Sequence, residues 1–435
     1  MTFRKLLLLT LILCAGVLPA QTRKAKDLPP SAFKLIAVTA SGSRRYTPGE
    51  IVAATGLRLG QTVSEDDFKV ASEHLGDTGA FSDIAYSFKY APEGTTLDLQ
   101  VIDSNQYVPA RFDNFVWLPD QELLRQLHER VPLFQSQVPV SGNLADQVSD
   151  ALQALLIEGK VHGRADYLRS AAQDGPIDSV IFSVSGPDIR IGNVGFAGAR
   201  PEELPFLLKA ALPMRGLSYL RSILRVQTDK NLLPVYLARG YLKASFGDAQ
   251  AKVVEQSPEK TLVDVTFSVE PGRQYKLTEV HWSGNSAFRV KQLDALIHLQ
   301  AGEPANAMLL AADLGAIQKI YGSRGYLAAT VTPTPLMDDE QSTVSYQLEV
   351  QEGDIYKMGE LEIQGLDERN TAHVQDVWQL RGGETYDSSY PQRFLQALEK
   401  ELSLGDEWSI HIQEAPNQDD KTVDVTVRFD PKPPR

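Results

Sequence analysis

Apolar and polar positions alternate most clearly between Tyr275 and Gly353, where the pattern predicts one small domain. Leu277, Val280 and Trp282 indicate a first strand, which Gly284-Asn285 should end because both residue types tolerate positive φ. Two helices and then two strands should follow. They are expected at 292–299 (helix), from the N-cap Asn306 to about Tyr321 (helix), at 326–332 (strand), and at 344–350 (strand), after an acidic turn at 337–341. The predicted order is β-α-α-β-β.

The same order recurs along the chain, which predicts an α+β fold built as a tandem array of five β-α-α-β-β domains. Each domain should be a three-stranded mixed sheet with two helices on one face. The repeats are expected at 33–104 (repeat 1), 105–188 (repeat 2), 189–273 (repeat 3), 274–354 (repeat 4) and 355–431 (repeat 5). Repeat 2 diverges most, because Leu118-Pro119 replaces the glycine that ends the first strand elsewhere.

Local signals define the second helix of several repeats. In repeat 1, Ser64 followed by Asp67 resembles a capping box, and Gly60 precedes Ser64 by the spacing that separates Gly302 from Asn306. In repeat 3, Pro234 lies within the expected second helix, which should therefore kink or restart there. Gly-Tyr pairs at 240–241 and 325–326 indicate a helix stop before the second strand.

The first 20 residues are typical of a secretory signal peptide. Arg4 and Lys5 precede an apolar run at 6–18, and small residues follow near Ala20. An uncleaved signal anchor is the alternative. Leu13 stands before Cys14, where a lipoprotein processing site usually has a small residue, so we expect no lipid anchor. Residues 21–32 should form a linker without fixed structure.

Composition narrows the possible chemistry. The only cysteine lies in the leader, so an exported mature chain has neither a disulfide nor a thiol nucleophile. The net charge of −13 at pH 7 argues against nucleic acid or an anionic membrane surface as partners. With 435 residues and 43% hydrophobic composition, the chain can form several small cores.

No pattern indicates catalysis, so we expect a protein that is not an enzyme and has no cofactor or metal. The histidines are scattered singly, without HExxH or paired ligand spacing, and no GxSxG, GxGxxG or phosphate-binding loop occurs. They are at positions 74, 128, 162, 281, 298, 373 and 411. Each is expected to be a surface residue or a satisfied core residue.

The five repeats, with Gly284-Asn285 after the first strand and the Gly-Tyr pairs at 240–241 and 325–326, resemble polypeptide-transport-associated (POTRA) domains. Such domains typically form periplasmic arrays before the membrane barrel of Gram-negative outer-membrane protein assembly factors and two-partner secretion transporters. The resemblance covers nearly all of 33–431. We expect this chain to lack the C-terminal barrel, because the fifth repeat is followed only by a short proline-rich end.

An open sheet has unpaired backbone groups at its margin, and these groups can accept another strand. The resemblance implies that the third strand is central and that the second strand is the free edge. The expected edges are 84–89, 244–248, 328–331 and 408–412. The candidate binding residues on them are Ile84, Tyr86, Phe88, Ala244, Phe246, Ala328, Thr330, Val331, Trp408, Ile410 and Ile412. The alternative is that these edges only face solvent or are protected.

The resulting hypothesis is an exported, periplasmic scaffold, peripheral to the outer membrane, that binds unfolded or nascent outer-membrane or secreted polypeptides by strand addition. Its other partners would be a separate outer-membrane barrel protein or assembly subunits. Two alternatives remain open. The chain could be the periplasmic half of a split translocation pore, or an exported enzyme with a site between domains.

Overall fold

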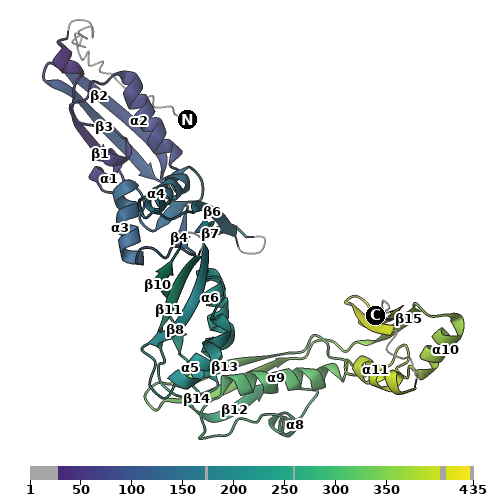
Figure 1. Cartoon of the computed structure of the whole chain (residues 1–435). Coiled ribbons are helices and arrows are strands. Elements are labelled where there is room, and N and C mark those ends of the chain that lie inside the picture. Colours follow the sequence, from purple (N-terminus) through teal and green to yellow (C-terminus); the bar gives the residue numbers. More distant parts are fainter. Residues whose placement is uncertain (1–27, 172–174, 258–259, 402–407, 432–435) are drawn as a thin grey trace, which may run out of the picture. The chain divides into compact units, whose positions relative to one another are not determined.

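The computed structural model of the chain describes residues 28–171, 175–257, 260–401 and 408–431 (Figure 1). The expected signal peptide and most of the expected linker lie outside the described residues. The chain divides into two compact units, which are Met1–Ile189 with Glu255–Thr261, and Arg190–Val254 with Leu262–Arg435. Repeats 1 and 2 form most of the first unit, and repeats 3 to 5 form most of the second.

Repeat 1 has a mixed sheet in the order β1-β3-β2, with β1 parallel and β2 antiparallel to the central β3. The element bounds are η2 Pro30–Phe33 (a 3-10 helix), β1 Leu35–Ser41, α1 Pro48–Ala54, α2 Glu65–Asp77, β2 Phe81–Ala91 and β3 Gly94–Asp103. Helix α2 lies along the sheet (Figure 1), and its apolar residues Phe68 and Leu75 are fully buried. Packing begins before residue 33, since Ala32 is also fully buried.

The predicted cap of α2 is present. The Asp67 carboxylate accepts hydrogen bonds from the Ser64 amide (2.7 Å) and the Ser64 hydroxyl (2.6 Å). These bonds, the hydroxyl bond first, hold the pKa of Asp67 below its ordinary value. Helix α2 is therefore stabilised above that ordinary pKa, and the stabilisation is lost as the pH falls through the lowered pKa.

We expect Asp67→Asn to lower the free energy of unfolding of repeat 1 by about 0.5–1 kcal/mol at pH 7, because an exposed cap contributes about that much. The difference from the natural chain should shrink as the pH falls from the ordinary pKa of an aspartate through the lowered pKa of Asp67. Hydrogen exchange of the α2 amides measures both effects. Asp66→Asn, which removes the same charge one residue earlier, is the matched control; an equal, pH-independent loss in both variants would contradict the prediction.

Repeat 2 differs from the expected three-stranded sheet, because its sheet has four strands in the order β5-β4-β7-β6. The element bounds are β4 Tyr107–Phe112, α3 Asp120–Arg130, β5 Gln137–Pro139, α4 Leu144–Glu158, β6 Arg164–Ala171 and β7 Ile177–Ser185. The added strand pairs with β4 and buries Val138 completely. The hydrophobic core of repeat 2 is continuous with that of repeat 1. Where the two repeats meet, the Arg45 guanidinium lies 3.8 Å from the centroid of the Tyr107 ring.

Repeat 3 also gains a strand. Its bounds are β8 Asp188–Ala197, α5 Leu204–Ala211, η3 Leu212–Met214, α6 Arg221–Gln227, η4 Thr228–Leu232 (a π-helical turn), α7 Leu233–Leu237, β9 Ser245–Phe246, β10 Gln250–Gln256 and β11 Lys260–Glu270. The sheet order is β10-β11-β8, and β9 also pairs with β11. The helix expected to kink or restart at Pro234 is continuous from α6 to α7, and its irregularity is the π-helical turn η4, which ends two residues before Pro234.

Repeats 4 and 5 have three-stranded mixed sheets in the orders β12-β14-β13 and β15-β17-β16. Repeat 4 contains β12 Lys276–Ser283, α8 Val290–Asp294, α9 Ala307–Gly322, β13 Thr330–Asp338 and β14 Thr343–Gln351. Repeat 5 contains β15 Lys357–Gln364, α10 Glu368–Val377, α11 Tyr390–Glu401, β16 Trp408–Asn417 and β17 Thr422–Pro431. Asn306 caps α9 as predicted, by accepting from the Leu309 amide at 2.9 Å.

Helix α8 is shorter than the predicted 292–299 and begins two residues earlier. The His298 amide, which a longer helix would use internally, donates instead to the buried Asp313 carboxylate at 2.8 Å. A side chain of α9 therefore accepts the hydrogen bond that the His298 amide would donate within a longer α8.

The Gly-Tyr pairs join consecutive repeats in the second unit. The Gly240 carbonyl accepts from the Tyr275 amide at 2.8 Å, and the Gly325 carbonyl accepts from the Tyr356 amide at the same distance. Two residues after each glycine, Leu242 packs against the core of repeat 4 and Leu327 against that of repeat 5. The motif is thus more than the predicted helix stop, and we call each of these two contacts a joint.

Candidate polypeptide-binding edges

The second strand lies at the margin of each three-stranded sheet, as the resemblance to POTRA domains implied. In repeats 1, 4 and 5 the third strand is central and pairs with both others. In repeat 2 the corresponding marginal strand is β6, and in repeat 3 the margin consists of β9 and β10, both paired with β11. Unpaired backbone N–H and C=O groups on such a strand are the atoms that strand addition uses.

The opposite margin, formed by the first strand, is paired near its start within its own repeat. In repeats 1, 3, 4 and 5 the loop before the second helix bonds to the first strand, and in repeat 2 strand β5 does so. A glycine amide in that loop donates to a first-strand carbonyl at 2.7–2.8 Å in the pairs Gly60–Leu35, Gly216–Ile191, Gly302–Leu277 and Gly383–Met358. The first strand is thus paired near its start in each sheet, whereas no such pairing is seen along the outer side of the second strand among the described residues.

The structure places most of the predicted binding residues on the second strands. Those inside strands are Ile84, Tyr86 and Phe88 (β2), Phe246 (β9), Thr330 and Val331 (β13), and Trp408, Ile410 and Ile412 (β16). Ala244 and Ala328 are not in strands, so the expected edges 244–248 and 328–331 were wrong in detail. Turns that follow the Gly-Tyr pairs occupy these positions, as shown by the hydrogen bond from the Ala244 amide to the Tyr241 carbonyl.

Three further features were missed. Strand β10 was not predicted, because the expected edge ended at Asp248. Strand β13 runs to Asp338, into the expected acidic turn, because its register with β14 continues to Thr343. Strand β5 is only three residues long, and its single buried valine gives too weak an alternation to detect.

In repeat 1 the open margin carries a row of aromatic rings. Tyr86, Phe88 and Tyr90 alternate along β2 and are only partly buried, on the same side as α2. The Phe88 ring lies 5.0 Å from that of Phe68 and 5.3 Å from that of Tyr90, measured between centroids. An added strand with apolar residues at alternate positions would cover this row, so the margin offers apolar surface as well as backbone groups.

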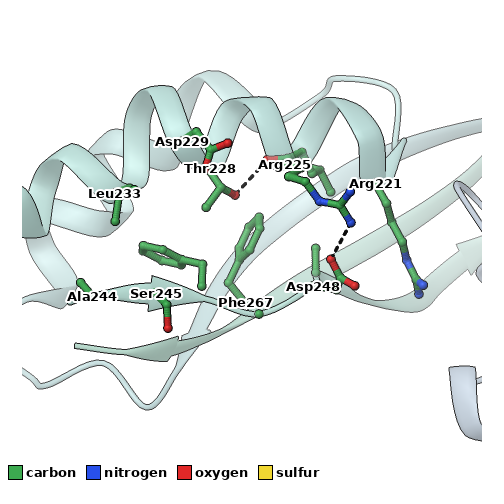
Figure 2. Close-up of a pocket in the computed structure, with 13 residues that line it drawn as sticks. Arg221, Arg225, Thr228, Asp229, Leu233, Ala244, Ser245, Asp248 and Phe267 are labelled. Atoms are coloured by element: carbon green, nitrogen blue, oxygen red, sulfur yellow. Dashed lines mark hydrogen bonds and ion pairs between the residues drawn. The ribbon is translucent and has the colours of Figure 1, made fainter. Parts of the chain in front are cut away.

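In repeat 3 the open margin lies beside a groove of about 330 Å³ between the helices and the sheet. Helical residues, including Leu224, Thr228 and Leu233, form one wall, and residues 244–249 of the edge form the other. Figure 2 shows Phe267 rising from the sheet toward the helices as the floor of the groove. The groove is large enough for one apolar side chain of a strand added at this edge.

The helical wall of the groove contains an irregular turn just before Pro234. A proline cannot donate to the preceding turn, and the helix accommodates this with the π-helical turn Thr228–Leu232. Within that region the Thr228 hydroxyl donates to the Leu224 carbonyl at 2.8 Å, four residues earlier. The regular helix α9 of repeat 4 has no such turn among its described residues.

One ion pair spans the mouth of the groove. Arg225 on the helix contacts the Asp248 carboxylate on the edge at 3.0 Å (Figure 2). Both side chains are about half exposed, so the pair contributes little to stability and can rearrange. A bound strand could therefore displace it at low cost.

In the cores of repeats 3 and 4, a buried tyrosine hydroxyl donates a hydrogen bond to a glutamate of the same repeat. Burial, followed by a hydrogen bond to Glu203 (2.7 Å), raises the pKa of Tyr236 well above its ordinary value. Burial and a bond to Glu352 (3.0 Å) do the same for Tyr321. These hydroxyls are neutral donors, each bonded to one oxygen of its carboxylate. Within the described residues, no group of three or more His, Cys, Asp or Glu side chains could hold a metal ion.

Among the described residues, no helix combines the length and the apolar character needed to cross a membrane.

Known proteins show similar repeats. Residues 275–353 match the family model described as POTRA, surface antigen variable number repeat. The chain is 23% identical over 285 residues to the outer membrane protein assembly factor BamA of Neisseria meningitidis serogroup B, a match covering 62% of this chain and 34% of that protein. It is 24% identical over 208 residues to a putative outer membrane protein assembly factor of Treponema pallidum, which covers 47% of this chain and 24% of the relative.

A solved structure of Haemophilus influenzae BamA POTRA3-5 matches with a TM-score of 0.44 and 22% sequence identity, over 55% of this chain and 95% of that one. The chain spans only about a third of the BamA relative and a quarter of the Treponema relative.

The described residues define a class of protein, namely a tandem array of small α+β domains whose second strands lie at open margins. Residues 275–353 match the POTRA family model, and repeats 1 and 5 have the same order of elements as this domain. Repeats 2 and 3 keep that order with an added strand, and repeat 3 also has extra helical turns, so the chain is a tandem array of repeats built like its POTRA domain.

Proposed function

We propose that this chain is a non-enzymatic periplasmic scaffold that binds unfolded outer-membrane or secreted polypeptides by strand addition. In this role it assists the assembly of outer-membrane proteins or their translocation. The observation that carries the proposal is the asymmetry of the sheets, in which the first strand is paired near its start within its own repeat and the second strand has no such pairing on its outer side. The names of the two curated relatives, both outer membrane protein assembly factors, support the same role.

Strand addition suits a binding protein that meets many sequences. Most of the affinity comes from main-chain hydrogen bonds, which any non-proline residue of the client can make. The aromatic row of β2 and the groove beside β9 and β10 would add a preference for segments with apolar residues at alternate positions. Strands of outer-membrane proteins have this alternation.

The proposed location and partners follow from the same role. An exported chain of this kind would work in the periplasm, peripheral to the outer membrane, and would hand its clients to an outer-membrane protein or to other assembly subunits. The limits of the five repeats given above are proposed as the limits of its domains.

A photo-crosslinking amino acid at Ser87, an exposed position on β2, is expected to capture a urea-unfolded outer-membrane protein diluted into buffer. The physical reason is that Ser87 lies on the open margin, where a bound strand must pass within reach. The same probe at Val70, which is 46% exposed on helix α2, is the matched control and should capture much less. Equal capture from both positions, or capture from neither, would contradict the proposal.

A further inference from the structure

The second strand of repeat 4 is unlike the other second strands in the described residues. No charged residue occurs in β13 between Thr330 and Met337, and Leu336 is 57% exposed. Apart from the two-residue β9 (Ser245–Phe246), the other second strands carry charged residues, namely Asp83 and Lys89 (β2), Arg164, Asp166 and Arg169 (β6), Lys252 and Glu255 (β10) and Glu414 (β16). An uncharged, exposed marginal strand with an apolar residue is the kind of edge that pairs with other chains.

Two prolines change this expectation. β13 pairs with β14 in an unbroken antiparallel register, in which Pro333 lies opposite Leu348 and Pro335 opposite Tyr346. In such a ladder the N–H and C=O of one residue point to the same side, and successive residues point to opposite sides. A proline facing β14 would interrupt the ladder, so Pro333 and Pro335 face the open margin.

The margin of β13 therefore lacks its central hydrogen-bond donors. Residues 331, 333, 335 and 337 face outward, and of these only Val331 and Met337 have an N–H group. These two are six residues apart, or about 20 Å at the usual rise of a strand. An added strand would bring two of its carbonyl groups against pyrrolidine rings, where they would lose water and gain no hydrogen bond.

From this geometry we propose that Pro333 and Pro335 close repeat 4 to strand addition, so that polypeptide binding is confined to repeats whose second strand lacks proline. The strands β2, β6, β9 and β10 meet that condition, and β16 has a proline only at its penultimate residue, Pro416. This inference rests on the proposed function, because it assigns strand addition to some repeats and denies it to one. It also explains how an uncharged margin avoids self-association, since missing donors take the place of charges.

The test restores the donors. In the full chain, Pro333→Thr with Pro335→Thr returns two outward N–H groups at exposed positions that have no role in the core. We expect a photo-crosslinker at Thr330 to capture unfolded outer-membrane protein at least about tenfold better in this double variant than in the natural chain, because each restored hydrogen bond strengthens binding. Sedimentation velocity should also show a higher average mass, from pairing of two β13 margins.

The matched control is Thr332→Val with Thr334→Val. These positions are exposed on the same strand, and the change raises apolar character and strand propensity without adding an outward donor. Capture and average mass should stay as in the natural chain. If the control gained as much as the proline variant, apolar character and not the missing donors would be the cause, and the inference would be overturned.

The remaining outcomes separate this inference from the proposed function. If the probe at Ser87 captures client and the folded proline variant shows no gain by either measurement, closure of repeat 4 is wrong and strand addition stands. If Ser87 captures nothing and the proline variant still self-associates, the closure is supported and the proposed client binding fails. Circular dichroism of each variant establishes that it is folded.

Discussion

Replacing Gly325 by alanine is expected to destabilise the joint between repeats 4 and 5 by about 3 kcal/mol. Gly325 has a φ of +87°, which disfavours any side chain. A Cβ atom there would also lie 2.8 Å from the Tyr356 carbonyl oxygen and 2.8 Å from a methyl carbon of Thr385. Exchange of the Tyr356 amide, which donates to the Gly325 carbonyl, should accelerate about 100-fold.

Gly302 provides a matched control within the same repeat. Its φ is +86°, almost the same as that of Gly325, and no atom lies within 4 Å of the position of its Cβ. Gly302→Ala should therefore show only the cost of the backbone conformation, about 1 kcal/mol. If both variants were equally destabilised, the joint would contribute nothing beyond the conformational preference of glycine.

The second large effect is expected in repeat 1, where Phe68→Ala should lower the free energy of unfolding by about 3–5 kcal/mol. Phe68 is completely buried, and its ring contacts that of Phe88 at the open margin. Its loss leaves a cavity between α2 and the sheet that neighbouring residues fill only in part. Hydrogen exchange of the β3 amides during urea titration measures the loss.

Val70→Ala on the same helix is the control for Phe68→Ala. Val70 is 46% exposed, so its truncation should change stability by no more than about 0.5 kcal/mol. Because the core of repeat 1 is continuous with that of repeat 2, we expect the loss at Phe68 to reach the β7 amides as well. Protection of β7 that stayed unchanged would show that the two repeats open independently.

The elements that the sequence predicted well are those with one face in a core. Val344, Tyr346, Leu348 and Val350 alternate because β14 is the central strand and buries one face along its whole length. The second helix of repeat 1 likewise has one face in the core, where Phe68 and Leu75 are fully buried. The open second-strand margin was expected only because of the resemblance to POTRA domains, since no residue pattern states which strand is central.

The marginal strands were harder to predict, because burial constrains them less. β13 was expected to end before Met337, and only its pairing with β14 shows that it continues to Asp338. The expected edge 244–248 ended before β10, because only pairing with β11 shows that the margin continues beyond β9. The role of Gly240 and Gly325 in joining repeats depends on residues 31 to 35 positions further along, which no local motif reveals.

Each joint places a leucine of one repeat on the core of the next, and this has a consequence for the energetics of the array. Leu242 and Leu327 complete cores that lie after them in the chain, so the repeats of the second unit are coupled to their nearest neighbours in a fixed direction. When repeat 4 unfolds, the core of repeat 5 loses its contact with Leu327. When repeat 5 unfolds, repeat 4 loses only the contact that its Leu327 made with that core. Unfolding in this part of the chain is therefore cooperative with a direction, from each repeat to the next. A fragment that starts at the first residue of repeat 4 or repeat 5 lacks the leucine that the preceding repeat packs against its core.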